Sequence, residues 1–127
     1  MLYNEALELA KPTLKKVVDL LSEKNYKAIE NIAELEHLTP ELIKEIIDEY
    51  LELNELTHID KYGVPCNFNP PNEYKQISGD IYFDNSGFWI DYDLTTDSEL
   101  NDLTLQMSFL FVDNNELKPI LLDLHVM

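Results

Sequence analysis

Two pairs of ionisable side chains near the end of the chain have the spacing that could do chemistry. Asp91 and Asp93 are two residues apart, and Asp123 and His125 repeat that spacing. In a β-strand, side chains two residues apart project from the same face of the sheet. Two carboxylates on one face could share a proton, and an aspartate beside a histidine is an ordinary general-base arrangement. If the sheet curls around a pocket, these four side chains line it.

Two non-catalytic roles fit the same residues. Aspartates on a solvent-facing sheet surface prevent edge-to-edge aggregation, without any further role. A face that carries Trp89 beside such aspartates could also bind another protein, because tryptophan is common at the centre of interfaces. The pattern alone leaves all three roles open.

The rest of the sequence predicts no catalytic, metal or cofactor site. His37, His58 and His125 are far apart, and none has a second ligand at the helical spacing of a zinc motif. Cys66 has no neighbours that indicate a nucleophile. The three glycines are too dispersed to build a phosphate-binding loop. We therefore expect no bound metal or cofactor.

The charge balance is strongly acidic. The 127 residues include 25 acidic side chains against nine lysines and no arginine, which gives a net charge of -16. Such a chain repels nucleic acid and anionic membranes, since both attract basic segments. It attracts basic proteins and speeds encounter with them. The alternative is that the acidity serves solubility alone.

The compartment is predicted from three features. Cys66 is the only cysteine, so the chain forms no internal disulfide, which is typical of a reducing compartment. The first residues lack the basic and apolar regions of a signal peptide. No apolar run approaches the roughly 20 residues that span a bilayer. We expect a cytoplasmic protein.

The sheet is predicted from strict alternation in the last third of the chain. One apolar and one polar face are expected for each of three strands, at 88–94, 103–112 and 120–126, and a weaker strand is expected at 77–84. In the last of the three, the apolar face is assigned Ile120, Leu122, Leu124 and Val126, and the polar face Leu121, Asp123 and His125. Turns are predicted at 84–87, 95–101 and 113–116, and loops at 60–63 and 69–72.

Three helices are predicted before the sheet. Apolar residues at three- and four-residue steps indicate the first over about 2–22, where Pro12 either kinks it or divides it, and the continuous stripe favours a kink. Asn25 could cap a short second helix. Thr39 and Pro40 begin the third, whose outer face is acidic at Glu45, Asp48, Glu49 and Glu52.

These elements predict one α+β domain over residues 1–127. The helical part covers about 1–56, and the sheet part, a curved antiparallel meander of about four strands, covers about 77–127. The three helices are expected to pack on one face of the sheet, which leaves the opposite face open.

Several short motifs carry a resemblance. Trp89 to Leu94, Asp102 to Leu105 and Asp123 to Val126, with Asn25-Tyr26 and Leu38 to Glu41 upstream, resemble a family of small uncharacterised bacterial proteins. The order of elements is similar to the NTF2-like (cystatin-like) fold. That resemblance implies a curved sheet that wraps a long helix around a cone-shaped cavity. It also implies roles as isomerases, as binding modules, or as immunity proteins of bacterial competition systems such as contact-dependent growth inhibition.

The leading hypothesis is an immunity (antitoxin-like) protein that binds a basic protein toxin, such as a nuclease, and covers its active groove. We expect the contact surface to be the predicted sheet face, with the acidic face of the third helix as the competing patch. The predicted sheet-face contacts are Trp89, Asp91, Asp93, Asp102, Asp123 and His125. The alternatives are an NTF2-like enzyme or a small-molecule binding module with a cavity lined by Asp91, Asp93, Asp123 and His125. Both a monomer and a homodimer fit the sequence.

Overall fold

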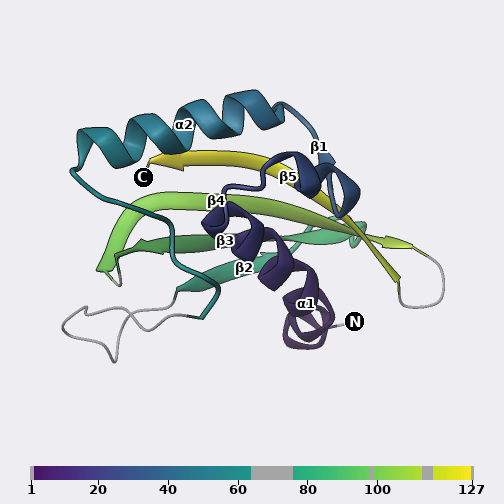
Figure 1. The fold of residues 1–127 in the computed structure, drawn as a ribbon. Helices are drawn as coiled ribbons and strands as arrows, with labels where there is room; N and C mark the ends of the chain where they lie inside the picture. The colour runs from purple at the N-terminus through teal and green to yellow at the C-terminus, as the bar shows by residue number, and fades with distance from the viewer. Residues whose placement is uncertain (1, 64–75, 98, 113–115, 127) are drawn as a thin grey trace.

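The computed structural model describes residues 2–63, 76–97, 99–112 and 116–126, with the backbone alone at 99–102 (Figure 1). The helical elements and a short strand come first: α1 (Tyr3–Ser22), the 3-10 helix η1 (Lys27–Asn31), β1 (Glu34–Leu35) and α2 (Pro40–Leu53). Four longer strands follow: β2 (Ile77–Ile81), β3 (Gly87–Thr96), β4 (Glu99–Val112) and β5 (Glu116–Val126). The predicted α+β class is confirmed.

The sheet is mixed and has five strands in the order β1-β5-β4-β3-β2. β2 to β5 form the predicted antiparallel meander. β1 adds a parallel edge, in which Glu34 and Leu35 pair with Ile120 and Leu121. The sequence prediction missed this strand because two residues are too few to show a side-chain period.

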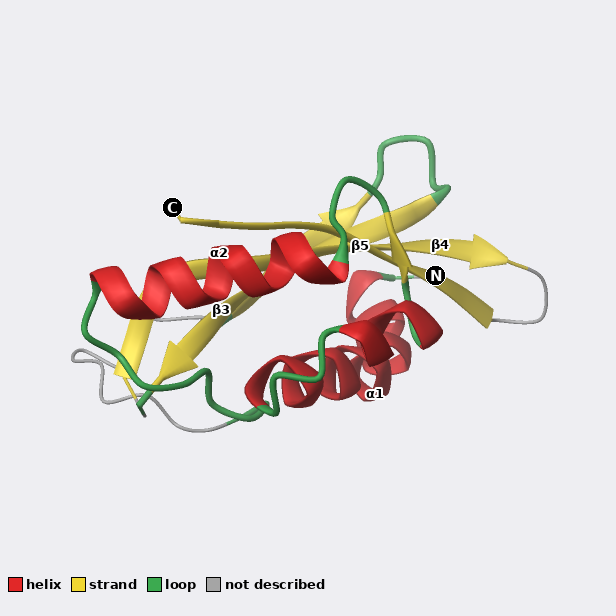
Figure 2. Cartoon of the chain, turned by 45° about the horizontal axis from the view of Figure 1, so that its top comes forward, coloured by secondary structure: helices red, strands yellow, loops and turns green. Residues whose placement is uncertain are grey.

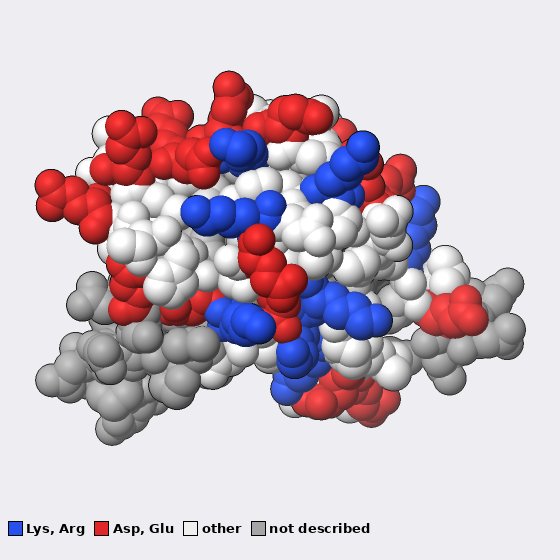
Figure 3. Space-filling view, in the orientation of Figure 1, with Lys and Arg blue, Asp and Glu red and all other residues white. Residues whose placement is uncertain are grey.

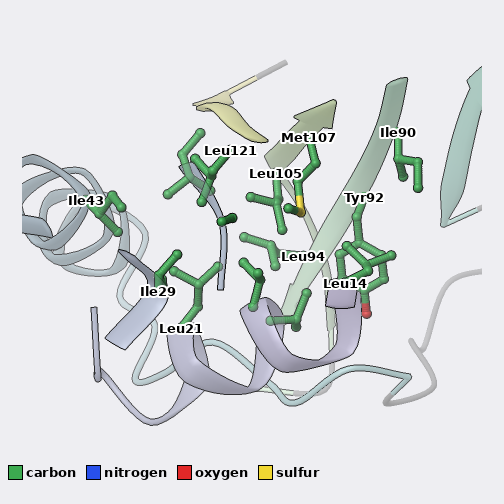
Figure 4. Packing of buried hydrophobic residues seen from close by; sticks show 14 of the residues in the cluster. Leu14, Leu21, Ile29, Ile43, Ile90, Tyr92, Leu94, Leu105, Met107 and Leu121 are labelled. Atoms are coloured by element: carbon green, nitrogen blue, oxygen red, sulfur yellow. The ribbon is translucent and has the colours of Figure 1, made fainter. Parts of the chain in front are cut away.

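Both α-helices lie on the same face of the sheet (Figure 2). Their apolar stripes and the inward side chains of the strands form one core, part of which is seen in Figure 4. Its largest fully buried side chains include Tyr92, Phe88, Phe109, Leu14 and Leu21. The space between helices and sheet is therefore occupied by packed hydrophobic side chains.

α1 is a single helix that contains Pro12, so the division into two helices is excluded. Its buried residues are Ala6, Ala10, Leu14, Val17, Val18 and Leu21. Two apolar residues within the predicted span of this helix, Leu2 and Leu9, are 72% and 44% exposed. Leu2 is the N-cap and precedes the first helical turn. A proline removes one helical N–H donor, and burial of the stripe outweighs that loss.

The second predicted helix is only the five-residue 3-10 helix η1, and the prediction that Asn25 caps it is wrong. Its N-cap is Tyr26, which makes no side-chain capping hydrogen bond. The predicted start of α2 is confirmed. The Thr39 hydroxyl accepts a hydrogen bond from the Leu42 N–H at 3.1 Å, and Pro40 occupies the first turn.

Alternation holds over residues 88–94 of β3 and 103–109 of β4, and it ends in β3 where the register shifts between Asp93 and Thr95. The predicted apolar faces are buried at Phe88, Ile90, Tyr92, Leu94, Leu103, Leu105, Met107 and Phe109. In β5 the prediction is wrong at Ile120, Leu121 and Leu122, because the register shifts opposite Gln106 and Met107, and Ile120 lies beside Ser108 on the face opposite the helices. Leu122 is the extra residue of this bulge, so Leu121 turns into the core and Leu122 does not. Asp123 and His125 keep their predicted face.

Two predicted turns have different bounds. β2 ends at Ile81 rather than at residue 84, so Phe83 lies in the turn and is fully exposed. The connection predicted at 95–101 is shorter, since β3 runs to Thr96 and β4 begins at Glu99. The predicted loop at 69–72 and the turn residues 113–115 lie outside the described residues. Across the residues that are described, no helix has the length and apolar character needed to cross a membrane.

Candidate functional site

The face of the sheet opposite the helices, which we name the open face, gathers the residues predicted from the alternation. Strand pairing brings them together in three rows across β3, β4 and β5: Asp93–Thr104–His125, Asp91–Gln106–Asp123 and Trp89–Ser108–Ile120. β2 extends two of the rows, since Ser78 lies beside Asp91 and Asp80 beside Trp89. Directly paired side chains share a face and are close enough to interact.

Hydrogen bonds fix part of the open face. The Thr104 hydroxyl donates to Asp93 Oδ1 at 2.9 Å, and the Tyr82 hydroxyl donates to Ser108 Oγ at 2.7 Å. Thr104 and Ser108 are themselves buried, because larger side chains on the neighbouring strands surround them. The middle of the open face therefore has a fixed arrangement of polar groups rather than freely rotating side chains.

Asp91 has an unsatisfied acceptor. Its Oδ1 is buried and has no hydrogen-bond partner among the described residues. A buried carboxylate oxygen without a donor costs free energy, and a donor from a bound partner would remove that cost. Asp91 therefore has more to gain from a donated hydrogen bond than an exposed acidic residue has.

The charge of the open face is negative. Four aspartates, at 80, 91, 93 and 123, lie on it. Of the lysines that the structure describes, only Lys118 lies on this face, and its ammonium is 3.1 Å from Glu34 Oε2. His125 Nδ1 lies 3.3 Å from Asp123 Oδ2. Because the one lysine is at the edge and paired, the centre keeps its negative charge.

The structure separates the two predicted acidic patches. Trp89, Asp91, Asp93, Asp123 and His125 share the open face. Asp102 lies in β4, and its side chain is outside the described part of the chain. The competing patch, made of Glu45, Asp48, Glu49 and Glu52, lies on the outer side of α2, which covers the opposite face of the sheet.

The α2 patch is less preorganised than the open face. Glu45, Glu49 and Glu52 are exposed side chains, and Asp48 forms an ion pair with Lys44 at 2.5 Å. Long exposed glutamates lose conformational entropy when a partner fixes them. Such a patch attracts a basic protein at a distance but provides little preformed geometry.

One cluster was missed by the sequence prediction. His58 lies between two carboxylates, with Nδ1 2.9 Å from Asp97 Oδ1 and Nε2 3.0 Å from Asp60 Oδ1. The Thr57 hydroxyl donates to Asp97, and the Thr57 N–H donates to Asp97 Oδ2 at 3.1 Å. Asp97 is far in sequence from Thr57, His58 and Asp60, so no local spacing indicates the cluster.

This cluster holds two segments of the chain together and does not have the arrangement of a catalytic group. Both ring nitrogens of His58 face carboxylates, so neither is available to a substrate. Hydrogen bonds from Thr57, together with the nearby His58, hold the pKa of Asp97 below its ordinary value. The contacts attach residues 57–60 to the β3–β4 turn, where the Asp60 N–H also donates to the Thr95 carbonyl.

A hollow of about 350 Å³ opens at the β5 bulge. Leu122 and Asp123 line it together with Gln106 of β4 and with Glu36 and His37, which follow β1. A bulge allows two successive residues to face one side of a sheet, which explains why Leu122 and Asp123 both contribute. Two of these residues, Gln106 and Asp123, belong to the open face, so the hollow is continuous with it. No group of metal-binding side chains occurs among the described residues.

Comparisons with known proteins identify a family. No curated protein and no solved structure matches the chain. A family model described as "Domain of unknown function (DUF7668)" matches residues 18–127, which includes α2 and every strand of the sheet. The chain belongs to the DUF7668 family.

Proposed function

We propose that the chain is an immunity (antitoxin-like) protein whose open face binds and blocks a basic protein toxin. One observation carries the proposal. The open face holds four aspartates around Trp89, with its only described lysine, Lys118, at the edge and paired. A negative surface of this kind steers a positive partner and suppresses wrong partners of like charge.

The centre of the open face has the composition of an interface anchor. Trp89 is half-buried between Asp80 and Ser108, and Ile120 lies in the same row. A large aromatic side chain surrounded by polar groups commonly contributes most to binding energy. Asp91, with its unsatisfied buried oxygen, is the acceptor that would gain most from an arginine or lysine of the partner.

The distribution of lysines supports the choice of this face. Lysine side chains lie across the helical side of the molecule, over α1 and the neighbouring elements, as Figure 3 shows. These lysines weaken the attraction of a basic partner to the α1 part of this side, whereas the acidic side chains over α2 in the same view still attract it. A toxin nuclease fits the partner's chemistry, because it must be basic where it holds nucleic acid.

Capture of partners from the protein's own cells, followed by an activity assay, tests the proposal. The tagged protein is used at about 50 mM and about 500 mM salt, a range over which exposed charge pairs are strongly screened. We expect a stoichiometric basic protein whose toxic activity the purified chain inhibits. A captured protein that is acidic, or one that keeps full activity in the complex, would contradict the proposal.

The hollow at the bulge favours a second candidate, a small-molecule binding module or enzyme of the NTF2-like kind. The relevant residues are the Asp123–His125 pair beside a hollow of about 350 Å³. Asp91, Asp93, Asp123 and His125 all lie on the open face, so a cavity lined by them is not the space between helices and sheet. A ligand-induced rise in melting temperature that His125→Ala abolishes would support this candidate over the first.

A further inference from the structure

The half of the open face nearest the β2–β3 turn is apolar, in contrast to the half that holds most of the aspartates. The row that contains Trp89 belongs to it. In the next row, the Tyr82 N–H donates to the Gly87 carbonyl at 2.8 Å, and Gly87 pairs with Leu110. Val112 lies two residues beyond Leu110 in β4 and therefore on the same face. We name five residues the apolar half of the open face: Tyr82, Trp89, Leu110, Val112 and Ile120.

The apolar half is separate from the core that the sheet forms with the helices. Among the described residues, that core includes none of the five. Four of them are partly buried by their neighbours on the sheet, and Val112 is 44% exposed. Neither α-helix lies on this face (Figure 2). Single apolar residues scattered over a surface are ordinary, whereas a contiguous apolar patch commonly marks a contact with another molecule.

The hydroxyl groups within the apolar half are already satisfied. The Tyr82 hydroxyl donates to Ser108 Oγ at 2.7 Å. Tyr82 follows β2 and Ser108 belongs to β4, so the phenol ring crosses β3, where Gly87 has no side chain. A Cβ at Gly87 would lie 2.2 Å from the Phe109 carbonyl oxygen, which explains why glycine is needed there. The ring is held in place, and a partner can exclude water from it without leaving an unpaired hydroxyl.

A hollow of about 440 Å³ extends the apolar half beyond the sheet. Tyr82, Phe83, Asp84 and Ser86 line it. Since Tyr82 belongs to both, the hollow and the apolar half are continuous. Phe83 is fully exposed, and a phenylalanine in that position contributes little to folding stability. Burial against another molecule would remove its apolar surface from water.

The charges around the apolar half favour one kind of occupant. Asp80 pairs with Trp89, Asp84 lines the hollow, and Glu116 pairs with Val112. A second copy of the chain would bring the same acidic rim and a net charge of -16, so the two copies repel. An anionic membrane is repelled for the same reason. A protein with an apolar centre inside a basic rim is attracted.

From these observations we propose that the apolar half binds an apolar contact of the basic partner. A large apolar side chain of the partner packs on Leu110 and Ile120 beside Trp89, while its cationic residues reach the surrounding carboxylates. Exposed charge pairs are screened by salt and contribute little to affinity, so the apolar half supplies the part of the binding that salt does not weaken. This inference rests on the proposed function and specifies the chemistry of the partner's contact surface.

The experiment uses the full chain and two synthetic peptides of equal length and equal charge. One peptide alternates lysine with tryptophan, and the other alternates lysine with serine. Amide NMR titrations are recorded at about 150 mM salt, where the charge contribution is screened equally for both. We expect saturable shifts at residues 87–89, 108–112 and 118–120 and about tenfold tighter binding of the tryptophan peptide.

Two double variants show whether the apolar half is responsible. Leu110→Thr/Ile120→Thr replaces two of its apolar residues by threonine, which suits a strand. The matched control, Leu53→Thr/Val126→Thr, makes the same kind of change at residues that are 74% and 56% exposed and lie outside the apolar half. We expect the first variant to lose the tenfold preference and the control to keep it. Circular-dichroism melts check that both variants fold.

Equal affinity of the wild type for both peptides, or an equal loss of preference in both double variants, would overturn the inference. Self-association of the wild type in analytical ultracentrifugation that Leu110→Thr/Ile120→Thr abolishes would also overturn it, because a second copy would then occupy the surface.

Failure of the proposed function has a different signature. A captured basic toxin that the chain inhibits, without any preference for the tryptophan peptide, contradicts the inference alone. A tryptophan preference located at the apolar half, without a captured basic toxin, contradicts the immunity function and supports the assignment of this surface to a contact with an apolar centre and a basic rim.

Discussion

The two faces of the sheet come from the same strands but have different compositions. On the covered face, β3 and β4 contribute fully buried apolar residues such as Phe88, Ile90 and Met107. On the open face the intervening positions are Trp89, Asp91 and Gln106. Stability needs only the covered face and does not require a tryptophan among aspartates on the opposite one. The composition of the open face is therefore not required by folding stability, and it fits the proposed contact with a protein partner.

The largest expected effect is on stability, and it compares two neighbouring residues at the β5 bulge that lie on different faces of the sheet. Leu121 is fully buried, while its neighbour Leu122 lines the open hollow. We expect Leu121→Ala to lower the free energy of unfolding by about 2–5 kcal/mol and Leu122→Ala by less than about 1.5 kcal/mol. Urea unfolding of the two variants provides the measurement. Equal losses would show that the bulge does not divide these two residues between faces.

Trp89→Ala tests the open face directly. The side chain is half-buried on a surface that no core element covers among the described residues. We expect roughly 30-fold weaker binding of a captured basic partner, which corresponds to about 2 kcal/mol at an interface centre. Isothermal titration calorimetry measures the affinity, with the circular-dichroism melt as a folding control. Unchanged affinity would remove Trp89 from the interface.

The contribution of Tyr92 to stability depends on pH, which provides a test of the covered face. Burial raises the pKa of Tyr92 to about 12. Its hydroxyl accepts hydrogen bonds from the Gly63 N–H at 3.2 Å and the Gln76 amide at 3.1 Å. A raised pKa means that its contribution to stability is complete below about pH 10, the ordinary value, and is lost as the pH rises through about 12.

We expect Tyr92→Phe to cost about 1–2 kcal/mol at neutral pH, because two donors lose their acceptor. The variant should also lose one tyrosinate that titrates near pH 12 in an ultraviolet absorbance titration. An unchanged titration curve would show that a different tyrosine has the high pKa.

The smallest expected effect concerns the contacts of Asp97 that attach residues 57–60 to the β3–β4 turn. The pKa of Asp97 is lowered, first by the Thr57 hydroxyl, so its stabilising contribution is present above the ordinary aspartate pKa and lost as the pH falls through the lowered value. Asp97 has a positive φ of 51°, which asparagine also tolerates. We expect Asp97→Asn to speed hydrogen exchange at the Asp60 amide at about pH 7, and the acceleration to shrink as the pH falls through the lowered pKa of Asp97. Equal acceleration at every pH would indicate backbone damage instead.

Much of the fold could be predicted, because it depends on local patterns. Alternation predicted the inward faces of β3 and β4, and the Thr39–Pro40 pair predicted the start of α2. The bulge at Leu122 could not be predicted, since one inserted residue leaves an apolar run unchanged. β1 depends on pairing with a distant strand and has no period of its own.

The candidate site likewise has one part that could be predicted from the sequence and one part that could not. Asp91 and Asp93, like Asp123 and His125, share a face because of a two-residue spacing that is visible in the sequence. Once the strands are paired, these four residues also lie on one surface with Trp89. The His58–Asp97 contact depends on where two distant segments of the chain meet, so it has no spacing that a sequence reveals.

The measurement that tests the central claim most directly compares two double variants for binding to the basic partner. Asp91→Asn/Asp93→Asn removes two charges from the open face, and Glu45→Gln/Glu49→Gln removes two from the α2 patch. We expect at least about tenfold weaker affinity for the first, through faster dissociation, and less than about threefold for the second, through slower association at low salt. Equal losses, or a larger loss for the α2 variant, would contradict the assignment of the interface to the open face.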